Sequence, residues 1–274
     1  MKMLRTRIAP TPSGYLHIGN VVNALMVWAH ARAVGGHVTL RIDDLDPQMS
    51  QVEYLEDIFR TIDWLGIDVD AGPSSVLEVE QTWSQQYRRA AYDAVLQTLV
   101  DQGALFACGC TRREIALAGS SGVYPGTCRD RRIPLDATDV SLRLLDDSVA
   151  LLPFPVVRLK NGLPAYHIAS LVDDVSMDIT WILRGADLEP SSLVQRQIAR
   201  RVPGLAQFAD VEIVHHRLIC DERGEKLSKS RGATDVRHLR EMSEGLGVVL
   251  EAVSRLHGCP LVASVHDLPS VIRY

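Results

Sequence analysis

The chain has 274 residues, 46% of them hydrophobic and 23% charged, with a formal net charge of −5 and a pI near 6.0. It has no run of about 18 apolar residues, and its charged start lacks the apolar segment of a secretory signal, so we expect a cytoplasmic protein. Five cysteines in a chain of this size do not indicate a disulfide framework.

The first elements form a repeating strand and helix pattern. Leu4–Ala9 is predicted as a strand, followed by a loop rich in proline and glycine. Val21–Val34 has helical apolar spacing, with Asn20 placed to cap the helix and Gly35-Gly36 to end it. A second strand is predicted at Val38–Ile42. A strand, helix and strand within about 40 residues form the βαβ unit of a parallel sheet, so we expect an α/β, doubly wound (Rossmann-like) fold.

The later elements alternate in the same manner around one irregular segment. Residues 103–135 are rich in glycine, cysteine and arginine with little periodicity, which indicates an insertion lying on the sheet. The expected domains are residues 1–102 and 161–235 as halves of a nucleotide-binding core, 103–160 as the insertion and 236–274 as a helical tail. Helices are predicted at Val52–Leu65, Thr82–Gln102 and Leu193–Val202, extended segments at Pro153–Leu159, Ile179–Leu183 and Val211–Ile219, and an apolar core segment at Leu163–Leu171.

The first motif is the loop and helix start Pro12–Asn20. A helix N-terminus offers free N–H groups and the positive end of a dipole, which suits phosphate. Gly19 would let a nucleotide approach the backbone, and His17 could donate a hydrogen bond to a phosphate oxygen as charge develops there. Taken alone, the histidine is better explained as a core residue.

The second motif is Lys226-Leu227-Ser228-Lys229-Ser230, after a polar turn. Two lysines three residues apart with interleaved serines suit a loop that clamps a polyphosphate. Taken alone, such a segment is usually a solvated loop.

The third motif combines Cys108 and Cys110 with a later Cys128 in the irregular segment. Thiolates in a loop-rich insertion fit structural zinc, which prefers them in a tetrahedral array. The residues leave the fourth ligand open, with histidine or water as options, and three unlinked thiols are the alternative.

The first two motifs, in this order and about 210 residues apart, resemble the two signatures of the class I aminoacyl-tRNA synthetases. Asn20 stands where many members have a second histidine, and Leu227 where many have methionine; both substitutions occur in the glutamate-specific branch. The resemblance covers about residues 5–235. Its further segments are Arg7–Gly14, Arg41–Pro47, Tyr166–Asp174 and Ile179–Leu188.

The resemblance implies residue roles. Arg184 would hold one end of glutamate with Tyr166, and guanidinium groups such as those of Arg7 and Arg184 suit carboxylates. Thr11 supplies a hydroxyl where the family often has serine, and Asp43, where the family more often has glutamate, would meet the ammonium group. Tyr124 would be the fourth zinc ligand. The residues implied in ATP binding are His17, Gly19, Asn20, Lys226, Ser228 and Lys229, of which His17, Gly19, Lys226 and Lys229 would also be catalytic.

After Ser230 the 274-residue chain has 44 residues left, too few for the usual anticodon-binding region. It therefore resembles the truncated paralogues, the glutamyl-Q tRNA(Asp) synthetases. That implies activation of L-glutamate with ATP and Mg²⁺, transfer to the queuosine base of the tRNA(Asp) anticodon, structural zinc and a monomer. The alternatives are a tRNA 3′ end or a carrier protein as acceptor, or a non-catalytic RNA-binding paralogue.

Because the chain is acidic overall, an RNA would have to bind a local basic face. A solvated face is the alternative for each cluster. The three candidate clusters are Arg129, Arg131 and Arg132; Arg196, Arg200 and Arg201; and Arg231, Arg237 and Arg240.

Overall fold

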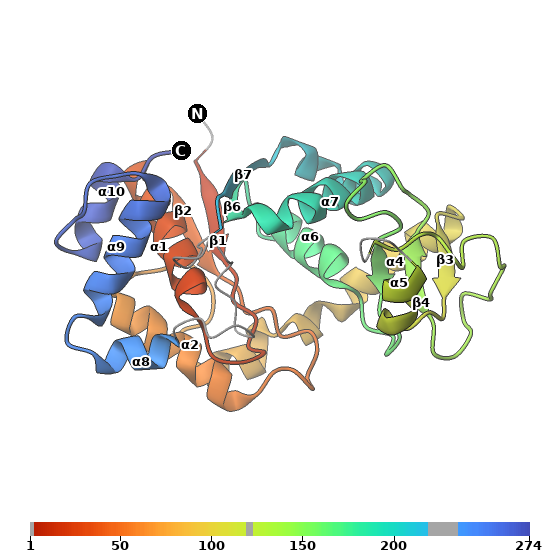
Figure 1. Ribbon diagram of the computed structural model, residues 1–274, viewed down its shortest axis with the longest axis horizontal. Helices are drawn as coiled ribbons and strands as arrows, with labels where there is room; N and C mark the ends of the chain where they lie inside the picture. Colours follow the sequence, from red (N-terminus) through yellow and green to blue (C-terminus); the bar gives the residue numbers. More distant parts are fainter. Residues whose placement is uncertain (1–2, 119–122, 219–234) are drawn as a thin grey trace. The chain divides into compact units, whose positions relative to one another are not determined.

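The computed structural model describes residues 3–118, 123–218 and 235–274 (Figure 1). The chain divides into two compact units. The first comprises Met1–Tyr87, Asp178–Leu188 and Val211–Tyr274, and the second Arg88–Met177 and Glu189–Asp210. The second unit takes in more of the chain than the insertion expected at residues 103–160. Among the described helices, none combines the length and apolar character needed to cross a membrane.

The first unit contains two pairs of parallel strands. Strand β1 (Arg5–Ile8) pairs with β2 (His37–Leu40), and β6 (Trp181–Gly185) pairs with β7 (Glu212–His216). The N–H of Thr180 donates to the carbonyl of Arg5 (2.9 Å), so β1 and β6 begin side by side. The α/β class is confirmed, although the described strands of this unit form two separate two-stranded ladders and not one continuous sheet.

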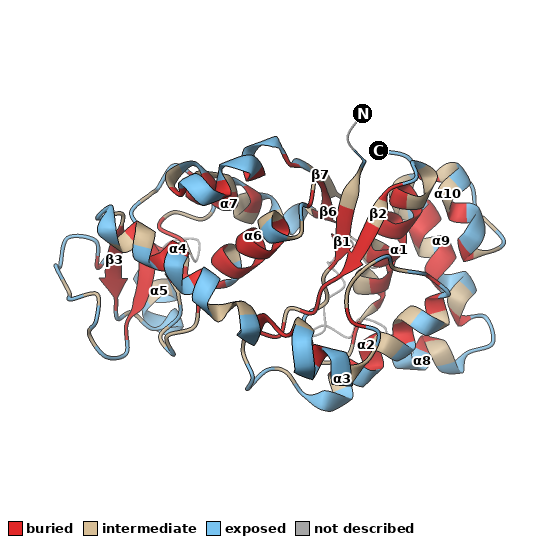
Figure 2. Ribbon diagram, turned by 180° about the vertical axis from the view of Figure 1, so that it is seen from behind, coloured by how far each residue is buried: buried red, intermediate tan, exposed pale blue. Residues whose placement is uncertain are grey.

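Helix α1 (Ile18–Ala33) connects β1 to β2 and is buried along most of its length. It packs against β1 and against two helices from the end of the chain, α9 (Gly245–His257) and α10 (Leu268–Val271) (Figure 1). Figure 2 shows the buried strands β1 and β2 beside this helix. The apolar core of this unit therefore joins segments more than 200 residues apart in sequence. The remaining helices of the unit are α2 (Val52–Leu65), α3 (Val76–Glu78) and α8 (Val236–Glu241), with a 3-10 turn at Val265–Asp267.

The second unit is built on an antiparallel sheet of β3 (Leu105–Cys108), β4 (Ser141–Leu144) and β5 (Val156–Arg158). The lack of periodicity in residues 103–135 concealed strand β3, whose four residues are all buried and so do not alternate. The helices of the second unit are α4 (Arg89–Asp101), α5 (Arg112–Ala118), α6 (Tyr166–Ser176) and α7 (Glu189–Arg201), with a 3-10 segment at Pro203–Asp210.

The single helix predicted at Thr82–Gln102 is wrong at its start. A π-helical turn (Val79–Trp83) ends at Ser84, a 3-10 turn (Gln85–Arg88) follows, and α4 begins only at Arg89. Tertiary hydrogen bonds explain the break: the N–H of Gln85 donates to the Asp44 carboxylate (2.7 Å), and its side chain accepts from the N–H of Leu45 (3.0 Å). These bonds require a non-helical backbone at Ser84, whatever the apolar spacing favours.

Candidate functional site

The first motif folds into a helix start capped by its own histidine. His17 is the N-cap of α1, and its Nδ1 accepts a hydrogen bond from the N–H of Gly19 (3.0 Å). Asn20 completes the capping box, because its side-chain oxygen accepts from the N–H of His17 (3.0 Å). The prediction that Asn20 is the N-cap is therefore wrong: the helix begins three residues earlier, and Asn20 caps from its third position.

The capping bond fixes the tautomer of His17. A neutral imidazole that accepts at Nδ1 carries its proton on Nε2, which is then a hydrogen-bond donor. Gly19 makes this arrangement possible, since a Cβ built there would lie 2.9 Å from Cε1 of the ring and 3.0 Å from Nδ1. Gly19 therefore leaves room for the His17 ring in its capping position. Any nucleotide would meet a helix start that this cap has already ordered.

The chain returns to this helix start after the second motif. Lys226, Ser228 and Lys229 lie outside the described residues. Asp235, which follows Ser230 after four intervening residues, forms an antiparallel β-bridge with His17. The N–H of Val236 donates to the carbonyl of Leu16 (3.1 Å). The segment that follows the lysine motif is thus anchored beside the histidine motif.

Two of the five residues proposed for glutamate lie in strands of the first unit, and two more lie in its loops. Arg7 is buried in β1, and Arg184 is buried in β6, which begins beside β1. The N–H of Asp43 donates to the carbonyl of Pro10 (3.0 Å), next to the exposed Thr11. Tyr166 begins α6 in the second unit and is 41% exposed.

Arg41 is a residue of this region whose role the sequence did not reveal. Its guanidinium is 1% exposed, and it binds both oxygens of the Asp43 carboxylate, at 2.6 and 3.2 Å. Its signal in the sequence was one arginine inside the apolar run Val38–Ile42. The Asp43 carboxylate is therefore already charge-paired, and any ammonium group would share it with Arg41.

Two histidines lie on β7, the strand that pairs with β6. The register places His215 opposite Arg184 and His216 opposite Gly185. Nδ1 of His216 donates to the carbonyl of Arg217 (2.7 Å), and burial lowers the pKa of His216 below 6.5, against the opposing effects of that hydrogen bond and of Asp187. We therefore expect His216 to be neutral at pH 7.

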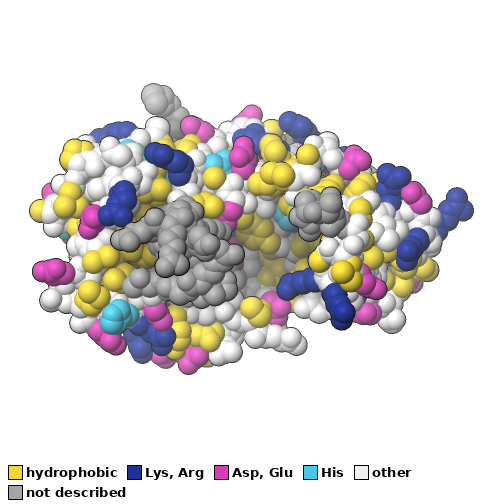
Figure 3. Space-filling model, viewed as in Figure 1, with side chains coloured by type: hydrophobic (Ala, Val, Ile, Leu, Met, Phe, Trp, Pro, Cys, Tyr) yellow, Lys and Arg dark blue, Asp and Glu magenta, His cyan; other side chains and the backbone are white. Residues whose placement is uncertain are grey.

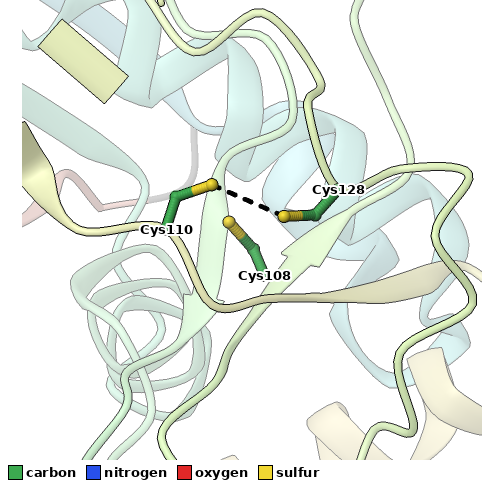
Figure 4. A group of neighbouring side chains, drawn as sticks. All are labelled: Cys108, Cys110 and Cys128. Carbon is green, nitrogen blue, oxygen red and sulfur yellow. Dashed lines mark hydrogen bonds between the residues drawn. The ribbon is translucent and has the colours of Figure 1, made fainter. Parts of the chain in front are cut away.

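The three cysteines of the third motif converge in the second unit (Figure 4). Cys108 ends β3, and Cys128 lies in the loop that leads to β4; the three sulfurs all lie within 4.8 Å of one another. Sγ of Cys110 and Sγ of Cys128 are 3.4 Å apart. The edge of a tetrahedral zinc–thiolate site with bonds of about 2.3 Å is about 3.8 Å, so the donor set and its spacing fit zinc.

Tyr124 lies beside this cluster. Its hydroxyl accepts a hydrogen bond from the N–H of Cys128 (2.9 Å), and its ring belongs to a buried group with Phe106 and Phe154. The hydroxyl is thus close to the sulfurs, while its role as the fourth ligand stays a prediction.

The cluster is electrostatically uneven. Burial opposes ionisation of Cys108, but hydrogen bonds from Tyr124 and from the Cys110 backbone, together with Arg143, outweigh it and lower the pKa of Cys108 to about 7. Burial and the neighbouring thiols raise the pKa of Cys110 to about 12. The pKa values of Cys108 and Cys110 thus shift in opposite directions, as expected for thiols packed together.

The basic clusters proposed for RNA differ in their availability. In the third, Arg237 pairs with Asp235 (2.6 Å) and Arg240 pairs with Asp57, while Arg231 lies outside the described residues. In the second, Arg201 pairs with Asp146 (2.5 Å). In the first, Arg131 and Arg132 are exposed. Figure 3 shows Lys and Arg side chains gathered on the part of the second unit that carries β3 and α5.

Comparison with known proteins identifies the family. The family described as tRNA synthetases class I (E and Q), catalytic domain, matches residues 3–122 and 149–258. A glutamyl-Q tRNA(Asp) synthetase of Prochlorococcus marinus (strain MIT 9303) is 36% identical over 256 residues, covering 89% of this chain and 78% of that protein. A glutamate–tRNA ligase of Desulfosudis oleivorans is 33% identical over 285 residues, covering 94% of this chain but 58% of that protein.

A solved structure shares the fold. The glutamate–tRNA synthetase of Elizabethkingia anophelis superposes with a TM-score of 0.75 at 21% identity, covering 98% of this chain and 66% of that one. The chain thus spans about two thirds of that synthetase. Together with the two sequence motifs, these matches show that the chain belongs to the class I tRNA synthetases (E and Q), a family of ligases, with relatives among the glutamyl-Q tRNA(Asp) synthetases.

Proposed function

We propose that this protein activates L-glutamate with ATP and transfers it to the queuosine base in the anticodon of tRNA(Asp). The observation that supports activation is the helix start of α1, where His17, Gly19 and Asn20 form an ordered, capped N-terminus beside Asp235 that suits phosphate. The names of several relatives, among them the Prochlorococcus protein, support the acceptor.

In the first step, the α-carboxylate of glutamate attacks the α-phosphate of ATP, forming glutamyl-AMP and releasing pyrophosphate. The Nε2–H of His17 and the N–H groups of the α1 start donate to phosphate oxygens as their charge grows. Lys226 and Lys229, with Ser228, stabilise the leaving pyrophosphate. Mg²⁺, when bound, would offset the negative charge of the phosphates. A hydroxyl of the modified base then attacks the acyl carbon and releases AMP.

Charge selects the amino acid in this proposal. Arg7 and Arg184 bind the carboxylates, Thr11 adds a hydroxyl, and Asp43 attracts the ammonium group. Arg41 donates to both oxygens of the Asp43 carboxylate, which orients this carboxylate and offsets part of its negative charge. Tyr166, by the family resemblance, would contribute a hydroxyl.

The remaining parts of the proposal concern organisation and partners. The two parallel pairs of the first unit are halves of a doubly wound, Rossmann-like sheet, and the enzyme acts as a monomer. The anticodon stem-loop binds exposed arginines of the second unit, with Arg131 and Arg132 among them. Zinc on Cys108, Cys110, Cys128 and Tyr124 would fix the loop that carries these arginines.

Glutamate-dependent exchange of pyrophosphate into ATP, measured without tRNA, tests activation. We expect exchange with glutamate and a much lower rate with glutamine, whose amide cannot pair with a guanidinium as a carboxylate does. If no amino acid supports exchange, the activation step is wrong.

Labelled glutamate then identifies the acceptor. We expect label on tRNA(Asp) that contains queuosine and none on the same tRNA lacking it. The second candidate, charging of a tRNA 3′ end, has support from the match to the glutamate–tRNA ligase. It predicts labelling of tRNA(Glu) that is lost after periodate oxidation of the terminal ribose.

Metal analysis tests the zinc centre. We expect about one zinc per chain in the purified protein and none in a Cys108→Ser variant. Cys259→Ser is the matched control, because Cys259 lies apart from the cluster. Full zinc occupancy in Cys108→Ser would contradict the proposed set of zinc ligands.

A further inference from the structure

The metal centre has an unbalanced charge. Three thiolates around a divalent cation leave a net charge of −1, and a phenolate ligand would make it −2. Cys108, Cys128 and Tyr124 are 0%, 2% and 5% exposed, so water screens this charge poorly. Burial of uncompensated charge is costly, and a cation close to the cluster would offset that cost.

Arg143 is placed to supply this charge. It lies on β4 opposite Phe106, in the strand pairing that also sets Cys108 opposite Ser141. Its side chain is buried, with the guanidinium carbon 3.8 Å from the centre of the Tyr124 ring. One nitrogen, Nη1, donates to the carbonyl of Phe154 (2.8 Å).

The surroundings of Arg143 are otherwise apolar. Arg143 contacts Phe106, Tyr124 and Phe154 of a buried apolar cluster, where a methionine would pack at less cost than a guanidinium. Its Nε is buried without a hydrogen-bond partner among the described residues. A buried arginine in apolar surroundings is costly unless a negative group lies close to it, and the thiolate cluster would be that group.

We propose that Arg143 is a positioning residue of the metal centre, whose buried positive charge tunes the three-thiolate cluster for a divalent, thiol-preferring cation and holds Tyr124 against it. This inference rests on the zinc centre proposed above. Arg143 touches no metal itself; it acts through Tyr124 and through its field at the sulfurs. Loss of such an outer partner typically weakens metal binding by about 10–100-fold.

The test is chelator competition for zinc on the full chain. We expect Arg143→Gln and Arg143→Met to weaken zinc binding by about 10–100-fold, and Arg143→Lys to recover most of the affinity because it restores the charge. Arg129→Met is the matched control: Arg129 also lies over an aromatic ring, that of Phe154 (5.9 Å), but it is exposed and paired with Asp130.

Replacing zinc by cobalt distinguishes loss of the Arg143 charge from loss of a cysteine ligand. The thiolate-to-cobalt absorption of Arg143→Gln should keep the intensity of the original protein, because the three sulfurs remain. If Arg143→Lys binds zinc no better than Arg143→Gln, or if both match the original protein, the inference is overturned. If the original protein itself binds no zinc, the proposed centre fails, which is a different result.

Discussion

At the scale of single residues, the histidine and glycine of the first motif act together. From the sequence, Gly19 is expected to let a nucleotide approach and His17 to contact a phosphate. The structure shows that the helix cap also requires both residues, because the His17 ring lies against Gly19 and accepts a hydrogen bond from its N–H. The spacing of the two residues thus reflects the capping of α1, and the proposed phosphate-binding role would build on that cap.

A Gly19→Ala substitution tests this coupling. The added methyl would lie 2.9 Å from the His17 ring, so the ring must leave its capping position. We expect the rate of glutamate-dependent pyrophosphate exchange to fall by about 10-fold or more, since one preorganised donor is worth about 10²–10³ in rate. The melting temperature should change little.

Gly247→Ala is the control for this substitution. Gly247 lies exposed in α9, and a Cβ there meets no atom within 4 Å. Because alanine favours a helix over glycine by about 1 kcal/mol, this variant should be slightly more stable and equally active. Unchanged exchange by Gly19→Ala would contradict the coupling.

At the scale of elements, buried charges join helices distant in sequence. Arg240 of α8 pairs with Asp57 of α2, whose side chain is 3% exposed, and also donates to the Thr61 hydroxyl (2.6 Å). The other carboxylate oxygen of Asp57 has no partner among the described residues. Arg240, which the sequence offered as a candidate for RNA contact, therefore links helices α8 and α2 through a buried ion pair.

Arg240→Met should destabilise the protein by about 3–5 kcal/mol, because it leaves the buried carboxylate of Asp57 unpaired. Unfolding in urea measures this change. The double variant Arg240→Met with Asp57→Leu should recover much of the loss, since no charge remains buried. Arg255→Met breaks an exposed pair with Glu251 and should cost less than about 1 kcal/mol. Equal effects at the two sites would show that burial is not the cause.

At the scale of the whole molecule, the core of the first unit closes around a histidine. His30 of α1 is 4% exposed, and its ring lies 4.4 Å from that of Trp181 and 5.6 Å from that of Tyr274. Burial, then Arg273 and His257, lower the pKa of His30 below 6.5. The unfolded chain therefore binds a proton at this position more readily than the folded protein does.

This difference makes stability depend on pH. The contribution of neutral His30 is fully present above pH 6.5 and is lost as the pH falls through the lowered folded pKa. We expect the melting temperature to fall between about pH 7.5 and pH 5.5, and to fall less in His30→Phe, which keeps an aromatic ring but no titratable group. His238→Gln, at an exposed position on α8, should behave as the original protein does. Identical profiles for all three would exclude His30 as the cause.

The amino-acid sequence by itself determined the features that depend on neighbours in the chain. The apolar spacing of Val52–Leu65 gives a helix with those bounds, and the cysteines two residues apart, with Cys128, gather as expected. The first two motifs, with Asn20 and Leu227 as departures, were sufficient to indicate the glutamate branch of the synthetases. Local periodicity and short motifs carry this information because it is written within a few residues.

Only the tertiary structure decided the contacts between segments distant in sequence. It interrupts the predicted helix at Ser84 through the hydrogen bond between Gln85 and Asp44. It also brings Asp235 back to His17 and joins α8 to α2. It also gives Arg41 and Arg143 their partners, Asp43 and Tyr124. A buried arginine in a strand looks the same in sequence whether it packs, pairs or tunes a metal centre. Its role follows from which charges the fold brings within a few ångströms, where a low dielectric makes them strong.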